Sequence, residues 1–186
     1  REILAQMEGE FSYAASLILD QSTDLSSNFL NMSSNLQGAS LNLPMPFGKS
    51  SVGSMPLNID IEFGDQQLIS GTLGEELSFI LDLESLTTNG IIYFGDTDTD
   101  LASLIESGVE GIAILGNLEK VMLEDWVNFL GESTSLGSAS TGFTNKLAFV
   151  DVVAGVLELY GQELPDVNMR IEGDELSVAP LVTLLS

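Results

Sequence analysis

The residues best suited to chemistry are three aspartates at alternate positions near the middle of the chain. Asp96, Asp98 and Asp100 form the pattern D-x-D-x-D directly after an apolar run that ends at Phe94. Carboxylates at this spacing are typical of loops that bind Ca²⁺, because a divalent cation relieves their mutual repulsion. Glu106 follows closely and could supply a fourth carboxylate. These four acidic residues therefore form a candidate calcium site.

The candidate site does not match the best-known calcium loop. An EF-hand requires glycine at its sixth position and glutamate at its twelfth. Counted from Asp96, these positions hold Leu101 and Ser107, so the EF-hand interpretation fails and a different calcium loop stays open. The alternative is an acidic turn that caps the following helix, where the helix dipole favours carboxylates.

Groups for enzymatic catalysis are scarce. The sequence contains no histidine and no cysteine, which excludes a thiolate nucleophile, a histidine-dependent triad, the usual zinc sites and any disulfide. The 28 acidic residues guarantee carboxylate pairs somewhere, so a carboxylate-dependent hydrolase is an alternative that no particular pair supports. The composition favours a non-enzymatic protein.

The charge balance restricts the partners and the location. Across 186 residues, 28 acidic and 5 basic side chains give a formal net charge of −23. Such a chain repels phosphate backbones, so nucleic-acid binding is excluded as a function class. No apolar run approaches the roughly 20 residues of a transmembrane helix. A mean hydropathy of +0.27 still allows a proper core. We expect a secreted or cell-envelope protein whose surface tolerates salt or Ca²⁺.

The segment before the aspartates predicts an antiparallel sheet. Apolar and polar residues alternate over residues 57–63, 67–73, 77–83 and 91–94. Gly64-Asp65, Gly74-Glu75 and Asn89-Gly90 supply turns between these runs. The pattern predicts a β-meander over residues 57–94 with one buried face. The aspartates then follow its last strand.

The segment after the aspartates predicts helices and then a hairpin. Apolar residues recur at helical spacing over residues 118–130 and again over residues 144–160, which predicts two main helices. Alternation returns after Pro165 and predicts a C-terminal β-hairpin over residues 166–185. The sequence as a whole predicts a single α+β domain over residues 1–186. Its meander core spans 57–94, its helical segment spans 99–160, and the two helices pack on one face of the sheet.

Two functional hypotheses follow besides the hydrolase. The favoured one is a non-catalytic, highly acidic extracytoplasmic protein that works by binding or by assembly, with a protein partner or with itself. In one version of this hypothesis its stability depends on Ca²⁺. The other is a carrier of apolar ligands such as lipids, because a curved sheet under helices can enclose an apolar cavity. The candidate lining residues are Phe11, Leu17, Phe63, Phe79, Tyr93, Trp126 and Phe149, and ordinary core packing is their alternative role.

Overall fold

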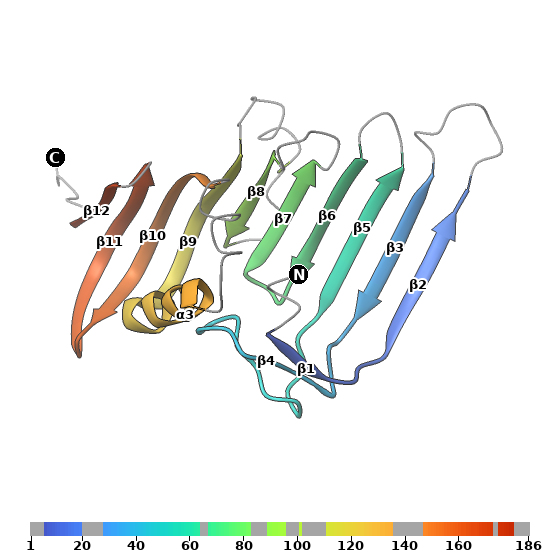
Figure 1. The fold of residues 1–186 in the computed structure, drawn as a ribbon, viewed down its shortest axis with the longest axis horizontal. Helices are drawn as coiled ribbons and strands as arrows, with labels where there is room; N and C mark the ends of the chain where they lie inside the picture. The colour runs from blue at the N-terminus through green and yellow to red at the C-terminus, as the bar shows by residue number, and fades with distance from the viewer. Residues whose placement is uncertain are drawn as a thin grey trace, which may run out of the picture.

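The protein is built mainly of β-strands. The computed structural model describes residues 6–19, 28–63, 67–82, 89–95, 101, 111–135, 147–172 and 175–180. Ten strands of this part form one sheet in the order β12-β11-β10-β9-β8-β7-β6-β5-β3-β2 (Figure 1). Strands that are neighbours in this sheet therefore follow one another along the chain. The exception is that β3 lies beside β5, because β4 is not part of this sheet.

The strands and the helix have the following bounds. The large sheet contains β2 (Tyr13–Ile18), β3 (Phe29–Ser34), β5 (Leu57–Phe63), β6 (Gln67–Leu73), β7 (Leu77–Asp82), β8 (Asn89–Phe94), β9 (Ile112–Met122), β10 (Leu147–Leu159), β11 (Gln162–Glu172) and β12 (Glu175–Pro180). β1 (Met7–Gly9) and β4 (Ala39–Leu41) form a separate antiparallel pair. The helix is α3 (Leu123–Ser135).

The sheet is mixed rather than purely antiparallel. From β2 to β8, each strand runs antiparallel to its neighbour. β9 then lies parallel to both β8 and β10. A parallel neighbour requires a crossover connection, and α3 lies within the crossover from β9 to β10. The antiparallel arrangement resumes from β10 to β12.

The prediction of an α+β fold with two main helices is wrong. Residues 118–122 complete β9, so the helix begins only at Leu123, and residues 147–159 form β10 rather than a second helix. β9 and β10 are both covered on both faces of the sheet, so apolar residues follow one another in their sequences instead of alternating with polar ones. Such a run also contains apolar residues at helical spacing, which led to the wrong prediction. The β-branched residues Val150, Val152, Val153 and Val156 favour the strand in β10.

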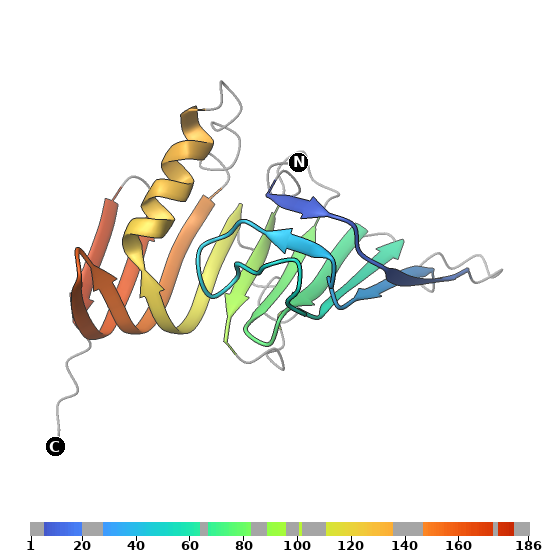
Figure 2. The same cartoon turned by 90° about the horizontal axis from the view of Figure 1, so that it is seen from below.

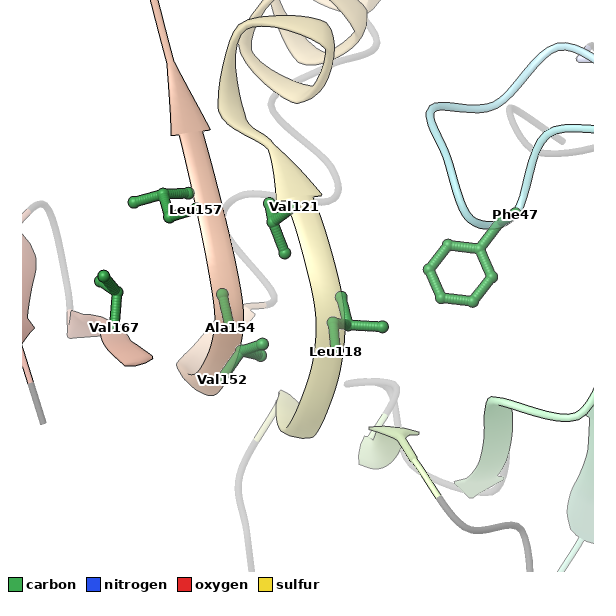
Figure 3. Packing of buried hydrophobic residues seen from close by; sticks show 7 residues of the cluster. All are labelled: Phe47, Leu118, Val121, Val152, Ala154, Leu157 and Val167. Carbon is green, nitrogen blue, oxygen red and sulfur yellow. The ribbon is translucent and has the colours of Figure 1, made fainter. Parts of the chain in front are cut away.

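The two faces of the sheet carry separate cores. The helix face is the face over which α3 lies, and its core joins Trp126 of α3 to Phe94, Leu118 and Val152 of the sheet. Figure 3 shows the buried members of this core, Leu118 and Val152 among them. The opposite face has its own core. That core contains Ile80, Ile91, Leu101 and Ala113, with Tyr93 and Phe149 packed against it. The strands in the middle of the sheet are therefore covered on both sides.

A long loop after β4 also reaches the helix face. Residues 42–56 connect β4 to β5, and this loop lies on the same side of the sheet as α3 (Figure 2). Its Phe47 is buried in the helix-face core, with only 4% of its surface exposed. The Lys49 Nζ anchors the loop by donating to the carbonyl oxygens of Leu36 at 2.8 Å, of Ser50 at 3.1 Å, and of Ala39.

Candidate apolar binding face

The strand register gathers apolar side chains on the helix face of β2 to β7. Residues directly opposite each other in paired strands share a face. The register Leu17↔Leu30, Leu30↔Ile61 and Ile61↔Ile69 therefore places these four residues in one row across four strands. We call the complete set the open face. It consists of Tyr13, Ala15, Leu17, Leu30, Met32, Leu57, Ile59, Ile61, Phe63, Ile69, Leu73, Phe79 and Leu81.

The open face is incompletely covered. Tyr13 is 64% exposed, Leu17 is 56% exposed and Phe63 is 41% exposed. Ala15 is exposed as well, the other members are half-buried, and none belongs to either buried core cluster. A sheet that faces the core with one side normally buries the apolar residues of that side. A contiguous apolar surface left open in this way marks an interaction site.

The opposite side of the same strands is polar and internally bonded. The Asn31 Nδ2 donates to the Asp60 Oδ1 at 2.8 Å, and the Asn58 Nδ2 donates to the Thr72 Oγ1 at 3.2 Å. Cross-strand pairs of this kind stabilise a solvated sheet face. The two sides of β3 and β5 therefore differ, since the opposite side carries Asn31, Asn58 and Asp60, although the exposed Phe29 of β3 and Ile18 of β2 also lie on it.

Phe47 lies at the inner end of one row of the open face. Its ring stacks on Phe94 of β8 with a centroid distance of 5.0 Å and an interplanar angle of 28°. Trp126 of α3 meets the same ring edge-on at 6.2 Å, and Phe129 meets Trp126 at 6.1 Å. Beyond these aromatic rings, the helix face is the packed core. The register places Phe94 opposite Leu77, so the Phe47 ring lies at the end of the row that contains Leu57 and Leu73.

Two pockets flank the loop that carries Phe47. One has a volume of about 300 Å³ and is lined by Met45, Pro46, Glu76, Glu119, Lys120 and Met122. The other has a volume of about 340 Å³ and is lined by Asn42, Leu43, Pro44, Met45, Asp125, Asn128 and Phe129. Space therefore remains on both sides of the loop, and Met45 lines both pockets.

Lys120 beside the first pocket is held by carboxylates. Its Nζ lies 2.8 Å from the Glu158 Oε2 and 3.0 Å from the Glu163 Oε1. The hydrogen bonds to Glu158 and then to Glu163 raise the pKa of Lys120 above its usual 10.5. The stability that this ion pair contributes is present below the unfolded pKa and is lost only as the pH rises through the raised value. Lys120 thus stays charged and paired at neutral pH.

The predicted calcium ligands are not placed by the structure. Asp96, Asp98, Asp100 and Glu106 all lie outside the described residues. Among the residues that are described, no group of three or more acidic side chains could hold a metal ion. The calcium site therefore stays a prediction.

The structure divides the seven predicted lining residues among different surroundings. Leu17, Phe63 and Phe79 lie on the open face, whereas Trp126 belongs to the helix-face core. Tyr93 and Phe149 pack in the core of the opposite face, and Phe11 is a half-buried residue before β2. Apart from Leu17, the predicted lining did not include the aliphatic members of the open face. Their signal was present in the alternation of Leu57–Phe63, which already placed four apolar side chains on one side.

The fold and this face define a β-rich protein with an incompletely covered apolar sheet surface. The chain belongs to the YhdP protein family, whose match covers residues 1–180. Membership of this family indicates a protein associated with the bacterial cell envelope. No curated protein and no solved structure matches the chain. Within the described residues, no helix is long and apolar enough to cross a membrane.

Proposed function

We propose that this chain is a non-catalytic binding module of the cell envelope that holds the alkyl chain of a lipid on its open face. The observation that carries the proposal is the apolar surface of β2 to β7, whose side chains are half-buried or exposed and belong to neither core cluster. Burial of an alkyl chain there stabilises the complex by about 0.8 kcal/mol for each methylene removed from water. The envelope is rich in such chains.

Charge favours a neutral alkyl chain over a second copy as the occupant. Two copies of a chain with a net charge of −23 repel each other when their surfaces approach. An uncharged alkyl chain meets no such repulsion. It also needs no hydrogen-bonding partner, in keeping with the aliphatic and aromatic side chains of the open face. Self-assembly is the competing interpretation, and the experiment below distinguishes it.

The substitution Ile59→Asp should weaken alkyl binding strongly. Ile59 lies in the middle strand of the open face, where the register pairs it with Met32 and Gly71. An unpaired carboxylate under an apolar ligand should cost about 2–3 kcal/mol, which is roughly a 30- to 150-fold loss of affinity. The measurement is titration of the delipidated protein with monoacylglycerols, followed by native mass spectrometry.

Asn58→Asp is the matched control for this experiment. Asn58 is the next residue of β5 and faces the opposite side, so the substitution adds the same charge without touching the open face. We expect wild-type affinity for this variant. Equal loss in both variants, or no binding to the wild-type protein, would contradict the proposal. A dimer of the wild-type protein that Ile59→Asp dissociates would instead support self-assembly.

Calcium dependence is a separate proposal that rests on Asp96, Asp98 and Asp100. If these carboxylates bind Ca²⁺, a chelator should lower the melting temperature of the protein, because ligand binding stabilises the folded state. Asp98→Asn should remove the difference between the two conditions. Identical melting with and without Ca²⁺ would contradict a calcium site. The hydrolase alternative would require that Asp98→Asn abolish an activity while the protein stays folded.

A further inference from the structure

We propose that the free edge of β2 pairs with the β2 strand of a second copy of this chain, so that two sheets join into one. β2 lies at one end of the ten-stranded sheet, and within the described part of the chain β3 is its only neighbouring strand (Figure 1). The other edge of β2 therefore presents backbone N–H and C=O groups that pair with no described strand. Such an edge is a template for pairing with a further strand. The inference concerns the edge of the sheet and does not depend on the ligand proposed for the open face.

β2 lacks the features that normally keep an edge strand from pairing. Edge strands of natural proteins carry charged side chains, proline or a bulge, or are covered by a loop. The nine residues 11–19 include no charged residue and no proline, and residues 12–19 are all exposed. The register between β2 and β3 contains no shift, so no bulge twists the edge away. The strand at the other end of the sheet, β12, does include Glu175 and Pro180, which oppose pairing.

The acidic character of the chain does not prevent contact at this edge. β2 and β3 contain no charged residue, and the first carboxylates met across the sheet are Asp60 and Glu62 of β5. In two joined sheets the β5 strands of the two copies are five strand spacings apart, which is about 24 Å. This distance is well beyond the Debye length of about 8 Å at physiological ionic strength. In the sequence, Glu10 and Asp20 flank the uncharged segment, so the remaining repulsion arises at its ends.

The sequence of β2 favours an antiparallel register centred on Ala15. Ala15 is the middle residue of the uncharged segment 11–19, so a two-fold axis at this position pairs the whole segment with its copy. Tyr13 then lies opposite the partner's Leu17, and an aromatic side chain opposite an aliphatic one stabilises a strand pair. Ala14 lies opposite the partner's Ser16 on the other side of the sheet. Since directly opposite residues share a face, the two open faces would become one continuous surface.

Cysteine cross-linking tests this register, because the sequence contains no cysteine of its own. In the proposed dimer, Ala15→Cys places two thiols directly opposite each other, with Cα atoms about 4.5–5.5 Å apart, which suits a disulfide. Tyr13→Cys is the matched control, since the two copies of residue 13 lie about 14 Å apart, too far for a disulfide. Under mild oxidation we expect a covalent dimer from Ala15→Cys alone. Val52→Cys, at an 85% exposed position outside the sheet, reports random collisions.

Added charge at the edge should separate the two copies. The double variant Ala14→Asp with Ser16→Asp changes exposed side chains that face away from the open face, and it sets two pairs of carboxylates directly opposite each other. Like charges in such positions destabilise strand pairing, so we expect roughly tenfold weaker dimerisation in sedimentation equilibrium. Ser50→Asp with Ser51→Asp is the matched control, since it adds the same charge to an exposed loop. Added salt should strengthen the wild-type dimer because it screens the repulsion between acidic copies.

Three results would overturn this inference. The first is a wild-type protein that stays monomeric at every concentration and salt level. The second is cross-linking of Tyr13→Cys that is as efficient as that of Ala15→Cys. The third is a dimer that Ile59→Asp dissociates and that the double variant at residues 14 and 16 leaves intact, because such a dimer would join open faces instead of edges. Alkyl binding by the double variant tests the proposed function separately, since the variant leaves the open face unchanged.

Discussion

The substitution Gly116→Ala is expected to prevent formation of a stable sheet. Gly116 lies in β9 between Phe94 of β8 and Val152 of β10, and its φ of +122° is rare for any residue with a side chain. A Cβ atom at this position would lie 1.9 Å from the Phe94 carbonyl oxygen and 2.7 Å from the Phe94 backbone nitrogen. These are backbone atoms, so no side-chain rotation relieves the overlap.

The expected loss exceeds about 4 kcal/mol, a large part of the 5–15 kcal/mol that stabilises a typical domain. The measurement is chemical denaturation followed by circular dichroism. Gly161→Ala separates the cost of the backbone conformation from the cost of the overlap with Phe94. Gly161 also has a positive φ of 72°, but an added Cβ would meet nothing within 4 Å. That control should lose only about 1–2 kcal/mol from the backbone conformation. Equal stability of the two variants would show that Phe94 does not crowd position 116.

Alternation along the sequence was sufficient to predict the strands that have one solvated face. Residues 57–63 and 67–73 coincide with β5 and β6, because apolar and polar side chains there point to different surroundings. The same signal placed Leu57, Ile59, Ile61 and Phe63 on one side. Local periodicity was therefore enough to predict the strands that have one buried and one solvated face.

The same reasoning failed where both faces are covered. In β10, Leu147, Val150, Val153 and Leu157 recur at helical spacing although the segment is a strand. β9 and β11 pair with β10 on either side, and those long-range contacts decide the conformation. The sequence of residues 147–159 does not indicate these neighbouring strands. Only its valines favoured a strand over the predicted helix.

The candidate site depended on register, which composition does not contain. Tyr93 and Phe94 are adjacent aromatic residues, yet Phe94 packs under Phe47 on the helix face and Tyr93 packs in the opposite core. A shift of one residue exchanges the faces of a strand, so an aromatic inventory cannot say which rings share a surface. The contact between Phe47 and Phe94 could not be predicted either, since it depends on a loop of residues 42–56 folding onto β8.

The substitution Leu157→Ala is expected to lower the free energy of unfolding by about 2–5 kcal/mol. Leu157 has no exposed surface, and the register pairs it with Val121 of β9, which is 4% exposed. Truncation removes buried methyl groups and leaves a cavity between α3 and the sheet. For a chain of this length, the melting temperature should fall by about 4–20 °C. Thermal and chemical denaturation both measure the effect.

Leu164→Ala is the control because Leu164 lies directly opposite Leu157 on β11 and is 44% exposed. The same chemical change there should cost less than about 1 kcal/mol, since water already reaches the side chain. A large difference between the two leucines would show that the helix face over β9 and β10 is a true packed core. Equal losses of stability in the two variants would mean that water reaches this region as it reaches the open face, and that Phe47 does not border a packed core.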